Sequence, residues 1–180
     1  MKHILLSVVT VLLLVAVKAQ QPPPSASDIL KEASLQAARE KKNVFVIFHA
    51  SWCGWCKRMD KSMNDDACKK YFDDNFVIRH LVVDEAKDKK DLENPGANEL
   101  KTKYNGEGQG IPFWLVFDKE GKLLADSKIK NDDGSGKSEN TGCPASEKEV
   151  AYFIEVLKKT TSLKADQLEI IRKRFRENDQ

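Results

Sequence analysis

The residues of this chain best suited to chemistry are two cysteines three positions apart, Cys53 and Cys56, in the segment FHASWCGWCKRM. A tryptophan precedes each cysteine, Trp52 and Trp55. Cysteines at this spacing suit three kinds of chemistry. They could form half of a zinc site, a short structural disulfide, or a pair of thiols that cycles between a dithiol and a disulfide.

The rest of the sequence gives little support to the first two alternatives. A structural zinc site usually takes four Cys or His ligands, commonly in two close pairs. The remaining cysteines, Cys68 and Cys143, lie far apart, and His49 and His80 lie inside strand-like runs, so we predict no metal site. A disulfide within one CxxC closes a very small loop. It would therefore remove little entropy from the unfolded chain, which disfavours a purely structural role.

The elements on either side of the pair favour redox chemistry. Residues 44–49 form an apolar run typical of a strand covered on both faces, and a helix is expected from the cysteines to about Tyr71. Unpaired N–H groups and the dipole at a helix start stabilise a thiolate. We therefore expect the pKa of Cys53 to fall from about 8.5 toward about 7 or below. Cys56, one turn on, is close enough to bond to Cys53.

The remaining patterns predict an α/β sandwich around one central sheet. The expected elements are a helix over 27–41 capped by Ser27 or Asp28, strands over 44–49 and 76–85, a helix over 97–105, a hairpin over 113–125, a helix capped by Ser146 and a last helix over 163–178. Residues 127–142 are expected to form a polar, Gly-rich loop. Part of this loop is similar to a calcium loop, but Gly142 occupies the position that requires Glu.

The first residues have the layout of a secretory signal. Lys2 and His3 precede an apolar run from Ile4 to Val17, and Val17-Lys18-Ala19 has small residues at the positions that a signal peptidase reads. This run is shorter than the roughly 20 residues that span a bilayer as a helix. We therefore expect residues 1–19 to be a signal peptide, 20–26 a Pro-rich linker, 27–160 the main domain and 161–180 a C-terminal helical extension. The protein would then be exported, to the periplasm or the medium.

Charge and cysteine count agree with this interpretation. Removal of residues 1–19 takes away Lys2 and Lys18, so Lys+Arg falls from 30 to 28, against 28 Asp+Glu. A neutral chain lacks the basic surface of a nucleic-acid-binding protein. The four cysteines all follow the expected cleavage point, and an even count fits an oxidising compartment. We hypothesise that Cys68 and Cys143 form a disulfide, although only the slack of residues 127–142 could bring them together.

Two motifs together carry a family resemblance. FHASWCGWCKRM resembles the W-C-x-x-C-K active-site segment of thioredoxin-fold disulfide oxidoreductases, and GIPFWLVFDKEGKLL resembles their second signature, a cis-proline followed by a hairpin. The resemblance covers residues 27–159. It implies a thioredoxin fold, a central mixed β-sheet flanked by helices, here with an extra C-terminal helix. It also implies that Cys53 is the nucleophile and Cys56 the resolving thiol. Pro112 would be cis and face them, and the Ile111 backbone would bind the substrate chain.

The sequence departs from the family pattern at two places. Many members carry a buried Asp six residues before the first cysteine, where it assists proton transfer, but this chain has Ile47. The pair between the cysteines is Gly-Trp rather than Gly-Pro, so the family's usual potential does not carry over. His49 is expected to be an ordinary strand-end histidine. Trp52 and Trp55 flank the thiols and are expected to contact substrate.

The resulting prediction is thiol–disulfide exchange on exported proteins, with no cofactor, by a monomer acting as a reductant or isomerase. The expected potential lies between about −270 and −180 mV, the range from thioredoxin to protein disulfide isomerase. A membrane electron carrier would keep the pair reduced. Two alternatives stay open at this point. The chain could be a non-catalytic binding module with structural cysteines, or a dedicated thiol reductase for cytochrome c maturation.

Overall fold

The computed structural model of the protein describes residues 22–131 and 134–179. The expected signal peptide and the start of the linker lie outside these residues. Within them, no helix has both the length and the apolar character needed to cross a membrane. The elements are α1 (Ala26–Glu40), β1 (Asn43–His49), α2 (Gly54–Met63), α3 (Lys69–Asn75), β2 (Phe76–Val82), η1 (Lys87–Leu92), α4 (Ala97–Lys103), β3 (Phe113–Phe117), β4 (Leu123–Asp126), β5 (Lys128–Lys130), β6 (Ser138–Asn140), α5 (Glu147–Thr160), α6 (Ala165–Arg176) and η2 (Glu177–Asp179).

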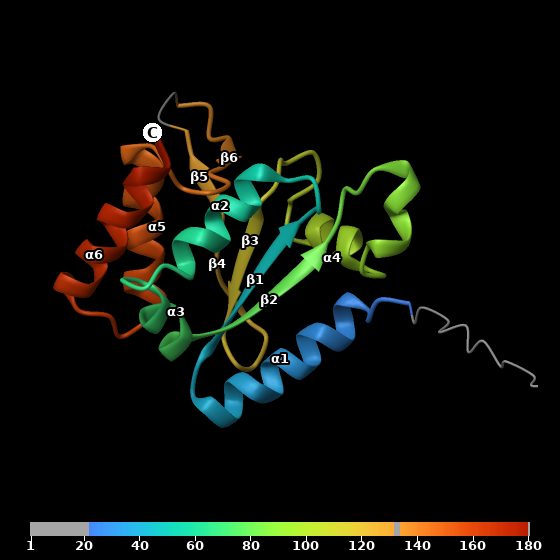
Figure 1. Ribbon diagram of the computed structural model, residues 1–180, viewed down its shortest axis with the longest axis horizontal. Coiled ribbons are helices and arrows are strands. Elements are labelled where there is room, and N and C mark those ends of the chain that lie inside the picture. Colours follow the sequence, from blue (N-terminus) through green and yellow to red (C-terminus); the bar gives the residue numbers. More distant parts are fainter. Residues whose placement is uncertain (1–21, 132–133, 180) are drawn as a thin grey trace, which may run out of the picture.

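The central sheet has the strand order β2-β1-β3-β4 (Figure 1). β1 runs parallel to β2 and antiparallel to β3, so the sheet is mixed, as predicted. β1 lies inside the sheet and buries both of its faces. Phe45 and Ile47 point into one apolar cluster, and Val46 and Phe48 point into the other. This arrangement explains why the strand is a continuous apolar run rather than an alternating one.

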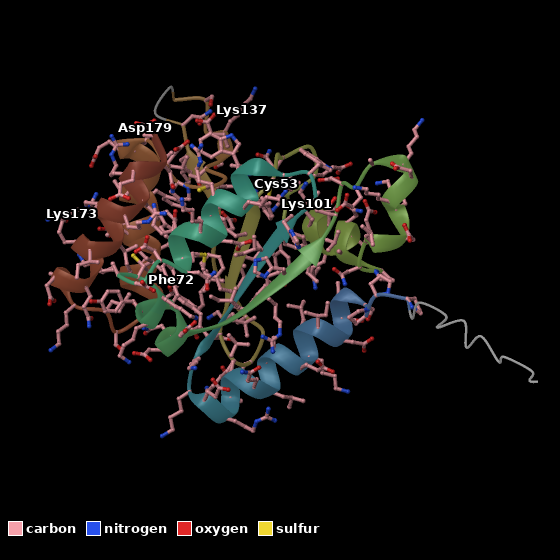
Figure 2. The ribbon with its side chains drawn as sticks, in the orientation of Figure 1. Cys53, Phe72, Lys101, Lys137, Lys173 and Asp179 are labelled. Atoms are coloured by element: carbon pink, nitrogen blue, oxygen red, sulfur yellow. A yellow bond between two sulfur atoms is a disulfide. The ribbon has the colours of Figure 1, made fainter. Side chains whose placement is uncertain are left out.

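Helices cover both faces of the sheet and complete the thioredoxin-like fold. On one face, Ala33 and Ala37 of α1 pack with Ala97 of α4. On the other face lie α2, α3, α5 and α6, which supply larger side chains such as Phe72 and Phe153 (Figures 1 and 2). The small residues of α1 let its backbone approach the sheet closely. The face covered by α2 is therefore the more aromatic one.

Three local expectations need correction. The helix after the cysteines is two helices, because Asp65 accepts hydrogen bonds from the Ala67 and Cys68 N–H groups and turns the chain between α2 and α3. The first helix begins at Ala26, one residue before the expected domain boundary. Its cap is Ser25, whose Oγ accepts a hydrogen bond from the Asp28 N–H at 3.1 Å. Residues 127–142 contain an antiparallel pair, β5 and β6, within the stretch expected to be a loop.

The C-terminal helix packs on the domain through the stripe that the sequence predicts. Leu168, Ile171 and Phe175 are buried. The Phe175 ring centroid lies 4.8 Å from that of Phe153 in α5. Lys173, on the opposite side of the helix, points outward (Figure 2).

The hypothesised bridge between Cys68 and Cys143 is not present, since both are buried free thiols. The reason is that the segment from 127 onward has little slack. β5 and β6 fold part of it, and the Trp114 indole N–H fixes its end by donating to the Gly142 carbonyl at 3.0 Å. Cys143 instead lies beside Asn178, whose Nδ2 donates to its sulfur at 3.5 Å.

Candidate active site

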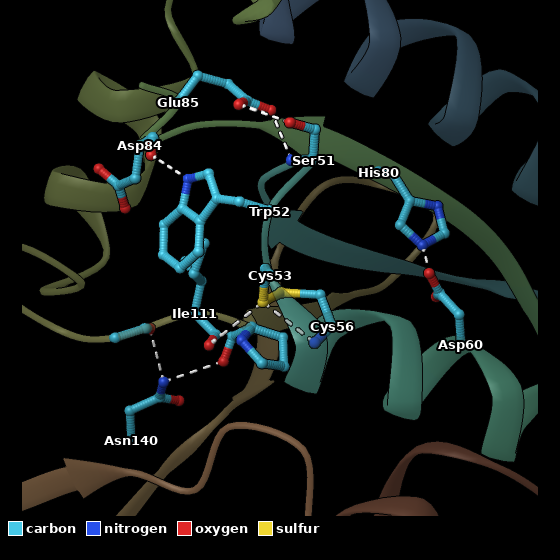
Figure 3. The surroundings of a disulfide bond; sticks show 12 residues. Ser51, Trp52, Cys53, Cys56, Asp60, His80, Asp84, Glu85, Ile111 and Asn140 are labelled. Carbon is cyan, nitrogen blue, oxygen red and sulfur yellow. Dashed lines mark hydrogen bonds and ion pairs between the residues drawn. A yellow bond between two sulfur atoms is a disulfide. The ribbon is translucent and has the colours of Figure 1, made fainter. Parts of the chain in front are cut away.

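Cys53 and Cys56 are joined by a disulfide at the junction of β1 and α2 (Figure 3). Cys53 is the N-cap residue of α2, and its sulfur accepts a hydrogen bond from the Cys56 N–H at 3.1 Å. A sulfur in this position lies close to the unpaired N–H groups at the helix start and to the positive end of the helix dipole. The same contacts would stabilise a Cys53 thiolate once the disulfide is reduced.

The loop before β3 faces the disulfide. The Ile111–Pro112 peptide bond is cis, as the resemblance implies, and the Ile111 carbonyl oxygen lies 3.7 Å from Cys53 Sγ. Asn140, in β6, holds this loop in place. Its Nδ2 donates to the Gly110 carbonyl at 2.7 Å and to the Pro112 carbonyl at 2.9 Å. Sequence reasoning missed Asn140, because an asparagine in a Gly-rich segment carries no signal of a partner elsewhere in the chain.

The two tryptophans lie on the surface beside the disulfide. Trp52 is 59% exposed and Trp55 is 50% exposed, unusually high values for such large apolar side chains. The Trp52 indole N–H donates to the Asp84 carbonyl at 2.9 Å, which fixes the ring. The Arg58 guanidinium carbon lies 4.6 Å from the centroid of the Trp55 ring. The rings are therefore positioned for contact with a substrate, and that role remains a prediction.

A pocket of about 390 Å³ opens between Trp55, the cis-proline loop and β6. Its lining includes Pro112, Asn140 and Thr141. The Thr141 hydroxyl is buried and has no hydrogen-bond partner within residues 22–131 and 134–179. Buried polar atoms are almost always paired, so this hydroxyl is an exception among the described residues.

Glu85, which sequence reasoning also missed, fixes the turn that leads into Cys53. Its carboxylate accepts hydrogen bonds from the Ser51 N–H at 2.5 Å and from the Ser51 hydroxyl at 2.8 Å. Burial acts to raise the pKa of Glu85, but the hydrogen bonds from Ser51 outweigh it and the pKa is lowered. The carboxylate therefore stays ionised and holds the turn.

The position of the family's buried acid is apolar here, and a different acid lies nearby. Ile47 is fully buried and is paired in register with His80 of β2. His80 Nε2 lies 2.8 Å from Asp60 Oδ1 on α2, and the His80 ring contacts the His49 ring with 5.1 Å between centroids (Figure 3). Burial, and then the charge of His80, lowers the pKa of His49. Across the described ranges, no three His, Cys, Asp or Glu side chains are grouped to bind a metal.

No curated protein matches the chain. Among solved structures, it is similar to the disulphide isomerase of Xylella fastidiosa Temecula1, at 23% identity over 60% of this chain and 77% of that one, with a TM-score of 0.47. It is similar to the DsbH oxidoreductase, at 20% identity over 77% of this chain and 83% of that one, with a TM-score of 0.42. A putative protein disulfide isomerase from Bacteroides thetaiotaomicron matches at 22% identity over 72% of this chain and 79% of that one, with a TM-score of 0.40.

The chain also matches a protein family. The sequence model of this family, which is described as thioredoxin-like, matches residues 26–119, more than half of the chain. The matched range contains the cysteine pair, the cis-proline and the strands β1 to β3 that position them. The chain therefore belongs to the thioredoxin-like family.

Proposed function

We propose that the protein catalyses thiol–disulfide exchange on protein substrates through Cys53 and Cys56. The observation that carries this proposal is the disulfide at the N-terminus of α2, with Cys53 as the cap and the cis-proline loop beside it. In the reduced protein, the Cys53 thiolate attacks one sulfur of a substrate disulfide and releases the other as a thiolate. Cys56 then attacks Cys53 Sγ and releases the second substrate sulfur, so that two electrons pass to the substrate.

The surroundings of the pair support a polypeptide as the substrate. Trp52 and Trp55 offer exposed aromatic surface next to the disulfide, which suits contact with another chain. The pocket beside Trp55 is open and is lined by the cis-proline loop. We propose that a substrate segment lies along Ile111 and places one side chain in this pocket.

We further propose that the protein acts after export, as a monomeric reductant or isomerase. The support for export is the signal-like sequence of residues 1–19. In a compartment that keeps disulfides oxidised, a cysteine pair of intermediate potential can act as a reductant or isomerase only if another molecule reduces it again. A membrane electron carrier is the proposed source of electrons.

The test is reduction of insulin by dithiothreitol, followed as turbidity. The protein should accelerate precipitation, and Cys53→Ser should abolish the acceleration. Cys56→Ser should accumulate mixed disulfides, because the second step is lost. Cys68→Ala serves as the control, since it removes a thiol away from the pair and should leave the rate unchanged. No acceleration at any pH would refute the proposal and favour the binding module instead.

The Cys56→Ser variant also identifies the partners. Expressed with its native leader, it should trap exported proteins as mixed disulfides that dithiothreitol releases. Several unrelated trapped proteins would support a general role. Capture of cytochrome c maturation proteins alone would point to the dedicated reductase.

A further inference from the structure

We infer that Asp60 and His80 form the proton-transfer pair of Cys56, in place of the acid that the chain lacks at Ile47. This inference rests on the proposed exchange reaction and concerns its second step. Cys56 must lose a proton before it can attack the mixed disulfide, because the thiolate is the nucleophile. Cys56 is only 2% exposed, so bulk water has little access to its sulfur. The proton therefore needs an acceptor within the protein.

At the position of the family's buried acid, the paired strands β1 and β2 provide a histidine but no carboxylate. Ile47 and His80 are partners in the parallel ladder of β1 and β2, so their side chains point to the same face of the sheet. That face is the one covered by α2, since Ile47 packs in the same cluster as Met59 of α2. His80 is thus directed toward the helix that carries Cys56.

The helix supplies the carboxylate. Asp60 follows Cys56 by four positions on α2, and side chains at this spacing are neighbours, with about 5–6 Å between Cβ atoms. Asp60 Oδ1 lies 2.8 Å from His80 Nε2, and Figure 3 shows Asp60 on the helix that carries Cys56, with its carboxylate directed toward His80. The His80 and Asp60 side chains are 37% and 38% exposed. The pair is therefore open to solvent, whereas the Cys56 sulfur is not.

The other titratable groups near the pair do not replace it. His49 contacts His80 from β1, and because burial lowers its pKa it stays neutral at neutral pH. The charge of Glu85 acts to raise the pKa of His49, but the Glu85 carboxylate is hydrogen-bonded to Ser51. The charge of Asp60 also reaches Cys143, whose pKa burial raises to about 12, so that this thiol keeps its proton.

In the inferred step, the Asp60 carboxylate takes the proton of the Cys56 thiol while His80 holds its other oxygen. The Cys56 thiolate then forms a bond to Cys53 Sγ, and the bond between Cys53 and the substrate sulfur breaks. The substrate leaves as a thiolate and takes up a proton. The proton on the pair passes to solvent. Asp60 acts on the reacting thiol, and His80 is a positioning residue that acts through Asp60.

The experiment separates the two steps with 5,5′-dithiobis(2-nitrobenzoate) as the probe. One equivalent added to the reduced full-length protein releases a first thionitrobenzoate when Cys53 attacks and a second when Cys56 resolves the mixed disulfide. Asp60→Asn should slow the second release by about 10²-fold at neutral pH, at the lower end of general-base effects. That release should recover as the pH rises. The first release should stay within about twofold, since the environment of Cys53 is unchanged.

Three further variants control this result. Asp66→Asn removes an exposed carboxylate beyond the end of α2, with the same change of charge, and should leave both phases unchanged. Asp60→Glu retains a carboxylate and should be faster in the second phase than Asp60→Asn. His80→Gln should slow the second phase and alter its pH profile. If Asp60→Asn folds poorly, this variant tests the pair through the partner of Asp60.

Two outcomes would overturn the inference. One is a second phase in Asp60→Asn that equals that of Asp66→Asn at every pH. The other is an equal loss in both phases, which would indicate a disturbed site rather than a lost proton acceptor. Absence of the first release in the unaltered protein would be a different failure, because it would refute the proposed exchange reaction itself and the relay with it.

Discussion

At the scale of single residues, this chain holds its cysteines in two contrasting environments. The sulfur of Cys53 accepts a hydrogen bond from the Cys56 N–H group at the start of a helix, and this contact favours the thiolate. Cys68 and Cys143 lie in the apolar core, where burial raises their pKa values to about 11 and about 12. Burial therefore keeps Cys68 and Cys143 protonated at neutral pH, so the proposed thiolate chemistry falls to Cys53 and Cys56.

The first prediction concerns these two thiols. In the native oxidised protein, N-ethylmaleimide should label neither Cys68 nor Cys143, because both are buried and protonated. In denaturant without a reductant, both should react, and peptide mapping should recover Cys53 and Cys56 as one disulfide. A cross-linked peptide of Cys68 with Cys143 would contradict the structure and restore the bridge expected from the cysteine count.

At the scale of elements, the C-terminal segment supports the active-site helix. The Arg58 guanidinium donates to the Asn178 carbonyl at 2.7 Å, and the Ser62 hydroxyl donates to Asn178 Oδ1 at 2.9 Å. Arg174 of α6 forms an ion pair with Asp65 at 2.8 Å. α6 and η2 are thus attached to α2 and to the turn that follows it, as well as to α5.

The second prediction tests how strongly α6 is attached. Phe175→Ala should lower the free energy of unfolding by about 3–5 kcal/mol, because it leaves a cavity among aromatic rings of α3 and α5. Ile170→Ala on the same helix is the matched control. Ile170 is 38% exposed, so its truncation should cost less than about 1 kcal/mol. Urea unfolding followed by circular dichroism gives both values, and equal effects would show that α6 contributes little to the core.

At the scale of the whole molecule, stability depends on groups whose ionisation differs between the folded and unfolded chains. The pKa of His49 is lowered from 6.5, first by burial and then by His80. The unfolded chain then binds more protons than the folded one just below pH 6.5, so stability falls as the pH decreases. Glu85 acts in the same direction at lower pH. Its pKa is lowered from 4.5, so its contribution is present above that value and is lost as the pH falls further.

The third prediction follows from these signs. The free energy of unfolding should decline as the pH is lowered from about 7 through about 6, before ordinary carboxylates titrate. His49→Asn should flatten the profile in that window and leave the loss at lower pH in place. Urea titrations at a series of pH values provide the measurement. A profile of the unaltered protein that is flat, or that rises toward acid, would contradict the burial of a neutral His49.

The fourth prediction concerns the redox potential. The helix N-terminus and the apolar Ile47 favour the reduced thiolate and make the pair more oxidising. Arg58 contributes less than its position suggests, because it is bound to Trp55 and the Asn178 carbonyl. No histidine lies between the cysteines to stabilise the thiolate further. We expect a value between about −270 and −180 mV, a window of roughly 4 kcal/mol.

Equilibration with glutathione buffers, followed by quantification of both redox forms, measures this value. The matched variant is Ile47→Asp, which restores a buried acid and should lower the potential. A potential near −120 mV, that of a strong oxidant, would overturn the proposed direction of electron flow. One well below −300 mV would indicate a structural disulfide.

The sequence by itself determined the parts of this protein that depend on neighbouring residues. The apolar run of β1, the hairpin of β3 and β4, the Ser146 cap of α5 and the stripe of α6 are all local patterns, and the structure confirms them. The pairing of Cys53 with Cys56 belongs to the same class, because three residues of helix bring their sulfurs together. Hydrophobic periodicity and capping residues determine such features through residues that lie within one or two helical turns of each other.

Only the tertiary structure decided which distant side chains meet. Asn140 reaches the cis-proline loop across 28 positions, Glu85 reaches Ser51 across 34, and Asp60 reaches His80 across 20. Each of these contacts depends on strand register and helix placement, which arise from packing between elements and leave no periodic signal in the sequence. The free thiols of Cys68 and Cys143 have the same origin. An even cysteine count favours a bridge, but a disulfide requires Cα atoms within about 7 Å, and packing alone sets that distance.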